Sequence, residues 1–373
     1  MTLSMPDPNG TFLVRLWHEG HGPIIAVLRD NRLFDITSRA TPTMSSLLER
    51  DDLLTFIAER KGTDLGPLDP LPDDLTLLAP CDLQVIKASG VTFAQSMVER
   101  VIEEQAAGDP DRAEAIRKKV TAVIGDSLAG VTPGSDKALQ VKDVLQAEGL
   151  WSPYLEVGIG PDAEVFTKCP TLAAVGHGAD VGLHPISRWN NPEPEIVLAV
   201  TSTGRIVGAT LGNDVNLRDV EGRSALLLGK AKDNNASAAI GPFLRLFDDS
   251  YTMDDMQQAE LTLTVTGQDG FTLNGRSSMS QISRTPASIV AQTIGAHHQY
   301  PDGFMLYLGT LFAPTQDRDA PGQGFTHKVG DVVSISEPSL GTLTNTVRLS
   351  TDCPPWQLGI TALMANLAGR GLL

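Results

Sequence analysis

The sequence places three carboxylates where they can share one ligand. Glu193 and Glu195 lie two residues apart at the start of an apolar run, and Asp214 ends the next apolar run. Residues two apart on a strand point to the same face. Ser202-Thr203-Gly204 between the runs is typical of a tight hairpin turn. A hairpin closed at Thr203-Gly204 places Asp214 directly across from Glu193, with about 5 Å between their Cβ atoms.

Three carboxylates at one point repel each other unless they are protonated or bridged by a cation. Hard oxygen ligands suit Mg²⁺, with Mn²⁺ and Ca²⁺ as alternatives. The same spacing also fits a polar strand end whose acids are simply solvated. A register shift of one residue would turn Asp214 to the opposite face.

Two further segments carry candidate binding groups. Lys230 and Lys232 precede Ile240-Gly241-Pro242, and Gly309-Thr310 follows the apolar run that begins at Phe304. An acidic protein that binds an anion needs a local cation, and a strand end can offer a hydroxyl and a backbone N–H. A surface lysine pair and an ordinary turn remain open as alternatives. The sequence has no P-loop, dinucleotide fingerprint or Gly-x-Ser-x-Gly motif.

Composition limits the partners of the chain. Its 373 residues carry a net charge of −16, and 41% of them are hydrophobic, which is enough for a large domain and a smaller one. The acidic balance disfavours nucleic acid and anionic membrane surfaces. No apolar run approaches the roughly 18 residues of a membrane span, and no secretory signal is evident. The three cysteines lack zinc or disulfide spacing, which favours reduced thiols and a cytoplasmic location.

The elements expected along the chain indicate an α+β protein. Short strands over 12–37 and helical spacing over 44–60 predict a small α/β N-terminal domain, 1–78, closed by a Pro- and Asp-rich linker over 62–80. The remaining residues, 79–373, form the predicted catalytic domain, with a helical insert over about 94–148. Beyond Glu164, many short alternating runs predict a β-rich, rolled or barrel-like sheet.

These residues, in this order, resemble the fumarylacetoacetate hydrolase superfamily from roughly 80 to 349. The matching positions are Glu193 and Glu195, Gly212-Asn213-Asp214-Val215-Asn216-Leu217-Arg218, Lys232 nine residues before Gly241-Pro242, Gly309-Thr310, Gly330-Asp331 and Leu343-Thr344-Asn345. The resemblance implies that Glu193, Glu195 and Asp214 hold a divalent cation. It also implies that Lys232, rather than Lys230, meets the substrate. Family members usually form dimers through the β-rich domain, so a homo-oligomer (a dimer or a dimer of dimers) is expected.

One departure from the family pattern points to a particular branch. Hydrolytic members carry a His and a Glu that activate water, but Ser96 stands at the histidine position, with Glu99 retained. Serine cannot act as a general base near neutral pH. The run from Glu164 to Lys168 is similar to that of the 2-keto-3-deoxy-pentonate dehydratases, in which a glutamate at the position of Glu164 lies in the active site.

The resemblance therefore implies a Mg²⁺-dependent hydro-lyase of pentose catabolism. It would convert a small 2-keto acid, a 2-keto-3-deoxy-pentonate of the xylonate or arabinonate type, to 2,5-dioxopentanoate. Glu164 and Lys232 are the expected catalytic residues, and Ser89, Lys232 and Thr310 are expected to contact the substrate. An acylpyruvate or diketo-acid hydrolase, or a keto-acid decarboxylase, using Glu99 or Glu164 as base is the alternative. A non-catalytic binding or assembly module is the third possibility.

Overall fold

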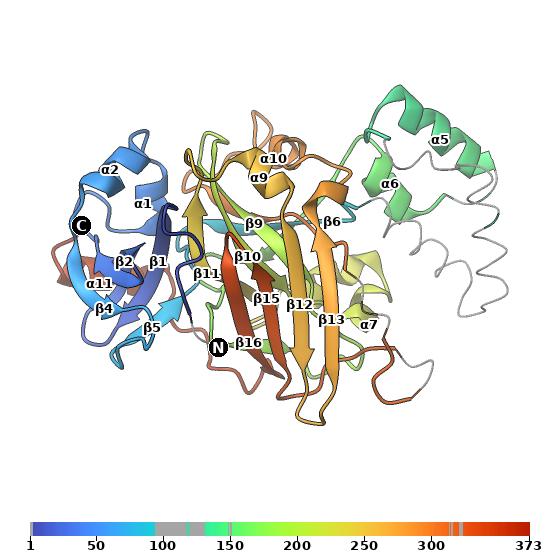
Figure 1. The fold of residues 1–373 in the computed structure, drawn as a ribbon. Helices are drawn as coiled ribbons and strands as arrows, with labels where there is room; N and C mark the ends of the chain where they lie inside the picture. Colours follow the sequence, from blue (N-terminus) through green and yellow to red (C-terminus); the bar gives the residue numbers. More distant parts are fainter. Residues whose placement is uncertain are drawn as a thin grey trace.

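The computed structural model describes residues 3–93, 118, 131–147, 149, 151–312, 314, 316–320 and 324–373. The described strands form two sheets (Figure 1). The larger has 11 strands in the order β4-β3-β2-β1-β11-β10-β9-β14-β6-β7, with β5 paired to β1. The smaller has 5 strands in the order β13-β12-β15-β16-β8. Neither sheet closes into a barrel within these ranges.

The strands of the larger sheet are β1 (Phe12–His18), β2 (Gly22–Arg29), β3 (Arg32–Asp35), β4 (Thr63–Pro67), β5 (Leu75–Leu78), β6 (Val85–Gly90), β7 (Glu164–Cys169), β9 (Pro194–Val200), β10 (Ile206–Asp214), β11 (Ala238–Leu246) and β14 (Phe304–Tyr307). Those of the smaller sheet are β8 (Asp180–Leu183), β12 (Glu260–Thr266), β13 (Thr272–Ser278), β15 (Val332–Glu337) and β16 (Gly341–Leu349). The described helices are α1 (Met44–Leu48), α2 (Leu53–Glu59), α5 (Asp136–Ala147), α6 (Pro153–Ile159), α7 (Arg218–Glu221), α8 (Leu228–Lys232), α9 (Met253–Gln257), α10 (Pro286–Thr293) and α11 (Ile360–Gly369).

Strand β9 is buried on both faces, which explains its unbroken apolar sequence. Ile196 and Leu198 pack into a core shared with Leu263 of the smaller sheet. Val197 and Ala199 point the other way and pack in a second core with Met44 and other residues of α1 and α2. Because residues two apart share a face, Glu193 and Glu195 lie on this second side, away from the smaller sheet.

The hairpin that carries the three carboxylates forms with the predicted register. Gly212 pairs with Glu195 and Asn213 with Pro194, and the Asp214 N–H donates to the carbonyl of Glu193 (3.1 Å). A bulge between Ile206 and Gly208 shifts the register near the turn, a detail that the sequence did not predict. The predicted pairing of Asp214 with Glu193 is therefore confirmed.

The Pro- and Asp-rich segment 62–80 is not the linker that we predicted. It contains β4 and β5, which pair with β3 and β1. Phe12 of β1 also pairs with Arg245 of β11, so one sheet runs across the predicted boundary after residue 78. The division into 1–78 and 79–373 stays a prediction, because a shared sheet does not tell whether either part folds alone.

The helices differ from the sequence expectations in one place. The helical spacing over 44–60 becomes two helices, α1 and α2, separated by a turn at residues 49–52. Within the predicted insert 94–148, helix α5 lies where a helix was expected. Ser96 and Glu99 lie outside the described residues. No helix in the described part of the chain has the length and apolar character needed to cross a bilayer.

An ion-pair cluster anchors the segment that follows β14. Arg318 donates two hydrogen bonds to Asp331, at 2.6 and 2.7 Å, and both side chains are 1% exposed. Asp269 and Lys328 extend the network toward solvent. We call this group the Arg318 cluster.

The observed architecture confirms the predicted α+β class with a rolled, β-rich C-terminal region.

Candidate active site

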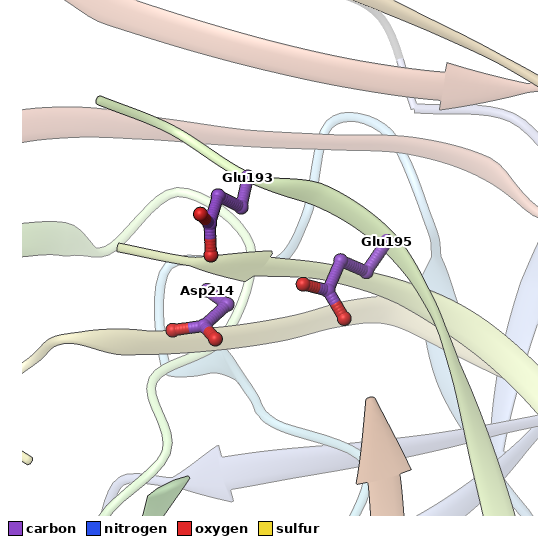
Figure 2. Close-up of side chains that lie close together, drawn as sticks. All are labelled: Glu193, Glu195 and Asp214. Carbon is purple, nitrogen blue, oxygen red and sulfur yellow. The ribbon is translucent and has the colours of Figure 1, made fainter. Parts of the chain in front are cut away.

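Three carboxylates meet where β9 begins and β10 ends. One oxygen from each of Glu193, Glu195 and Asp214 lies within 4.8 Å of the other two, and the three residues are only 6%, 3% and 2% exposed. Figure 2 shows the three carboxylates turned toward a shared space. We call these residues the carboxylate triad. The sequence prediction that they converge is confirmed as geometry.

Glycine at position 212 lets the wall beneath the triad pack closely. A side chain there would collide with the ring of Tyr307 and with Val197. Tyr307 is fully buried, and its hydroxyl donates to the carbonyl of Ala239 (2.7 Å), which fixes the ring against β10. The absence of a Cβ atom on Gly212 therefore holds the hairpin, and with it the triad, against β14 and β11.

Two buried lysines face the triad. Lys232, the last residue of α8, donates to Glu193 Oε2 at 2.6 Å and to Asp214 Oδ2 at 3.0 Å. Lys168 of β7 lies behind Asp214, with Nζ 2.8 Å from Asp214 Oδ1. It also donates to the carbonyls of Val215 (3.2 Å) and Lys232. Lys168 thereby ties the end of β10 to the end of α8.

Neutral donors also hold the two glutamates of the triad. The side-chain amide of Asn216 donates to Glu193 Oε1 (3.0 Å), and the Gly309 N–H donates to Glu195 Oε2 (2.7 Å). Gly309 has a φ of +87°, and a side chain there would collide with Thr92. The sequence suggested a hydroxyl and a backbone N–H at this strand end as binding groups. The N–H binds the Glu195 carboxylate of the protein itself.

The surroundings split the pKa values of the triad. Burial, together with the charges of Asp214 and Glu193, raises the pKa of Glu195 well above its usual value. Burial acts in the same direction on Asp214, but Lys168 and Lys232 outweigh it and lower the pKa of that carboxyl. Burial opposes the charge of Lys232, yet Asp214 and Glu193 raise its pKa well above the usual range. Glu195 is thus the carboxyl whose charge, once ionised, no lysine of the site matches.

All seven residues singled out from the sequence line one cleft. Its walls are formed by Ser89, Gly90, Val91, Glu164, Phe166, Glu193, Glu195, Asp214, Glu221, Leu228, Lys232, Gly309 and Thr310. Ser89 donates its hydroxyl to the Glu164 carbonyl (2.8 Å), and a side chain at Gly90 would collide with the Glu164 carboxylate. Lys230 is exposed. The structure thus brings Lys232, and not Lys230, to the triad.

Sequence reasoning assigned no role to three residues of this region. Lys168 is the extra residue of a β-bulge between β6 and β7. A bulge cannot be recognised from the alternation of apolar and polar residues along a strand. Asn216 follows the end of β10, where strand alternation from Asp214 would have placed it on the triad face. Glu221 lies on a helix of only four residues, too short to show a period. Glu99, which was also considered, lies outside the described residues.

The donor set fits a divalent cation. When all three carboxylates are ionised, the two ammonium groups leave one excess negative charge among residues that are at most 6% exposed. A divalent cation and a monoanionic ligand together would bring this total to zero. Carboxylate oxygens are also the ligands that Mg²⁺ prefers. The triad is therefore suited to an oxygen-ligated cation with an anion bound beside it.

A family model agrees with this geometry. The model described as Fumarylacetoacetate (FAA) hydrolase C-terminal matches residues 159–348, just over half of the chain. The matched range contains the triad, both buried lysines, Glu164 and Thr310. Ser89 lies outside it.

Two curated relatives match by sequence. The "Probable 2-keto-3-deoxyxylonate dehydratase" of Haloferax volcanii is 30% identical over 194 residues, covering 52% of this chain. The 2-dehydro-3-deoxy-D-arabinonate dehydratase of Saccharolobus solfataricus is 27% identical over 185 residues, covering 50% of this chain. The matched segments span 63% and 58% of the two relatives' lengths.

Solved structures share the fold over a longer range. The apo form of a 2-keto-3-deoxy-D-arabinonate dehydratase superposes with a TM-score of 0.65 and 21% identity. The structure of that enzyme complexed with magnesium and 2,5-dioxopentanoate gives a TM-score of 0.63 and 20% identity. Each alignment covers 91% of this chain and 99% of the other. At this identity the likeness establishes the fold.

Proposed function

This chain belongs to the fumarylacetoacetate hydrolase family, and from that premise we propose that it is a magnesium-dependent dehydratase of a 2-keto-3-deoxy-pentonate. The observation that carries the proposal is the cleft itself, because the triad, Lys232 and Glu164 all line it. No histidine lines the cleft among the described residues. The two curated relatives are named as dehydratases of such sugar acids, which supports the same activity here.

We assign Glu193, Glu195 and Asp214 as the ligands of the magnesium ion. When bound, the ion would polarise the 2-keto oxygen of the substrate and make the protons on C3 more acidic. Mn²⁺ and Ca²⁺ have the same preference for oxygen ligands and are the alternatives. Asn216 and the Gly309 N–H orient two of the carboxylates, a role that usually tunes such ligands.

Lys232 and Glu164 are the proposed catalytic residues. The Lys232 ammonium group lies at the triad, where it neutralises negative charge that develops on the keto-acid end of the substrate. Glu164 lies on the same cleft and supplies a carboxylate for proton transfer. Ser89 and Thr310 contribute hydroxyls to the cleft lining and are the proposed substrate contacts.

The dehydration balances without an oxidant or a reductant. Glu164 takes a proton from C3, the C3–H electrons form the C3–C4 double bond, and the C4 hydroxyl leaves as water with that proton. The double bond of the resulting unsaturated 2-keto acid then moves to C4–C5 as a proton leaves C5 and another adds to C3. The enol so formed ketonises to the aldehyde of 2,5-dioxopentanoate.

The activity can be tested directly. We expect the purified protein with Mg²⁺ to convert 2-keto-3-deoxy-xylonate or 2-keto-3-deoxy-arabinonate to an aldehyde, and EDTA to abolish the reaction. Acylpyruvates and oxaloacetate should be offered in parallel. Brisk cleavage of those compounds without any aldehyde from the sugar acids would favour the hydrolase or decarboxylase instead.

We also propose that the chain acts as a cytoplasmic homo-oligomer, a dimer or a dimer of dimers. All three cysteines are free and buried, which suits a reducing compartment. The outward face of the smaller sheet is rich in Thr and Ser, and interface cores are depleted of charged residues. Light scattering at several protein concentrations tests the assembly, since a monomer at all of them would contradict it.

A further inference from the structure

Helix α7 sends one side chain into the cleft and anchors the others elsewhere. The guanidinium of Arg218 lies 4.6 Å from the ring centroid of Trp189, and Val220 is buried in the core. The Asp219 carboxylate accepts hydrogen bonds from the Ser187 hydroxyl (2.7 Å) and the Arg188 N–H (2.9 Å). Glu221 is the residue of this helix that lines the cleft.

The carboxylate of Glu221 has no hydrogen-bond or ion-pair partner among the described residues. The residue is half-buried. Its negative charge nevertheless reaches the site, since after Asp214 and Glu193 it is a further contributor that raises the pKa of Lys232 against the effect of burial. An acceptor without a donor on the wall of a cleft is available to a ligand.

The backbone around Glu221 is fixed. The N–H of Glu221 donates to the Leu217 carbonyl and that of Gly222 to the Arg218 carbonyl, both at 2.9 Å. Ser224 then caps the turn that follows, because its hydroxyl accepts from the Leu226 N–H (3.2 Å). With its neighbours anchored on both sides, Glu221 presents its carboxylate to the cleft from a fixed position.

The charges on the cleft wall make this carboxylate selective. The described lining contains five acidic side chains and one cation, Lys232, which is already engaged by Glu193 and Asp214. No second cation in the described lining is available to a carboxylate at the far end of a ligand. Like charges without a bridging cation repel, whereas a hydroxyl can donate its proton to a carboxylate.

We propose that Glu221 determines substrate specificity by contacting the end of the substrate farthest from the 2-keto acid group. Its carboxylate accepts a hydrogen bond from a hydroxyl at that end and repels a second carboxylate. The inference rests on the proposed function, because it assumes that the 2-keto acid end is held at the triad and Lys232. It favours polyhydroxylated 2-keto acids over dicarboxylic ones. It also separates the sugar-acid substrates from diketo acids that carry a distal carboxylate.

Three ligands of equal chain length test the proposal by calorimetry on the Mg²⁺-loaded protein. They are 2-oxopentanoate, 5-hydroxy-2-oxopentanoate and 2-oxoglutarate, which differ only at C5. A hydrogen bond to a charged group corresponds to a change of about tenfold to a hundredfold in affinity. We expect the hydroxylated ligand to bind about tenfold more tightly than 2-oxopentanoate, and 2-oxoglutarate at least about tenfold more weakly.

Two variants at one position separate charge from hydrogen bonding. Glu221→Gln keeps an acceptor and removes the charge, so 2-oxoglutarate should gain about tenfold while the hydroxylated ligand changes little. Glu221→Leu removes both, so the advantage of the hydroxylated ligand should disappear. Glu59→Gln removes the same charge from an exposed site on α2 and should leave all three affinities unchanged.

The outcomes distinguish this inference from the proposed function. Binding of all three ligands with an order of affinity that Glu221→Gln and Glu221→Leu leave unchanged would overturn the role of Glu221 alone. That role would also be overturned if Glu59→Gln reproduced the effect of Glu221→Gln. No binding of any of them in the presence of Mg²⁺ would overturn the proposed function, and the inference with it.

Discussion

The carboxylate triad and the Arg318 cluster are both built from buried acids and bases, but they balance their charges differently. In the Arg318 cluster, one buried guanidinium meets one buried carboxylate through two hydrogen bonds, and the other charged members reach solvent. At the triad, three carboxylates share two ammonium groups, and none of the five residues is more than 6% exposed. The first cluster is complete in itself, whereas the second has an excess of charge.

Two equally buried carboxyls show the consequence. Burial tends to raise the pKa of Asp331, but the hydrogen bonds from Arg318 prevail and lower it to about 2. Burial raises the pKa of Glu195 as well, and there the neighbouring carboxylates add to the effect. When a buried acid is matched by a base, removing either partner destabilises the fold. A buried acid left unmatched marks a place where a cation is expected to bind.

The largest effect should come from removing the unmatched charge. Glu195→Gln should lower kcat/KM by about 10³-fold or more, because a lost metal ligand removes several kcal/mol of transition-state stabilisation. Its thermal midpoint in EDTA should equal or exceed that of the wild type, since the variant relieves a repulsion. A stability loss in EDTA comparable to that of a core truncation would contradict the view that Glu195 carries excess charge.

The matched cluster should respond in the opposite sense. Asp331→Asn leaves the buried guanidinium of Arg318 without its main counterion, so the free energy of unfolding should fall by about 3 kcal/mol. Urea denaturation measures this loss. Activity per folded molecule should stay within about threefold of the wild type, because Asp331 does not line the cleft. If Asp331→Asn were inactive but as stable as the wild type, the Arg318 cluster would serve activity and not stability, and the contrast with the triad would be wrong.

Magnesium should stabilise one region and not the other. At a Mg²⁺ concentration a hundred times its Kd, the wild type should gain about 2.7 kcal/mol in unfolding free energy. Glu193→Ala should gain nothing, and Asp331→Asn should gain as much as the wild type from its lower starting point. Scanning fluorimetry in Mg²⁺ and in EDTA compares the three proteins. An equal gain in Glu193→Ala would place the ion elsewhere.

One buried and one partly buried histidine should make stability depend on pH. Burial lowers the pKa of His327, which contacts Asp331, and of His177, whose Nδ1 accepts from the Thr344 N–H at 3.2 Å. Below about pH 6.5 these histidines bind more protons in the unfolded chain than in the folded chain. The free energy of unfolding therefore falls as the pH drops from 7 to 5. We expect about 1 kcal/mol for each group.

Urea midpoints at these two pH values measure the effect. His177→Gln should flatten the pH dependence, because glutamine can accept the same hydrogen bond without taking up a proton. A slope unchanged by that substitution would exclude His177 as a source of the pH dependence. The Asp331 carboxyl that contacts His327 does not account for a loss in this window, since its pKa is lowered to about 2.

The smallest effect should come from the exposed lysine. Lys230→Ala should change kcat/KM by less than about twofold and the unfolding free energy by less than about 0.5 kcal/mol. Lys232→Ala, only two residues away, should lose activity at least about a hundredfold because its ammonium group contacts Glu193 and Asp214. Steady-state kinetics of the two variants tests whether only the buried lysine contributes to kcat/KM.

The sequence predicted the site better than it predicted the sheet. Two apolar runs and a Thr203-Gly204 turn define the register of a hairpin, and register decides which side chains share a face. The convergence of Glu193, Glu195 and Asp214 was therefore accessible from local spacing. The distinction between Lys232 and Lys230 came instead from the family resemblance, in which the lysine lies nine residues before Gly241-Pro242.

Long-range pairing was not accessible in the same way. Strand β11 pairs with both β10 and β1, yet Gly241-Pro242 interrupts its apolar pattern and is typical of a turn. The register between β10 and β11 shifts near this point, and a bulge is where a sheet tolerates proline. Lys168 was missed for a related reason, because a bulge also positions it.

The pairing of β1 with β11 has a practical consequence for shortening the protein. A chain lacking residues 1–78 would keep the complete triad, since every member lies beyond that point. It would also uncover the backbone N–H and C=O groups of β11 that β1 now pairs, through Phe12 and Leu13. An unpaired strand edge is a template for aggregation. We therefore expect such a truncation to yield insoluble material in place of a minimal enzyme.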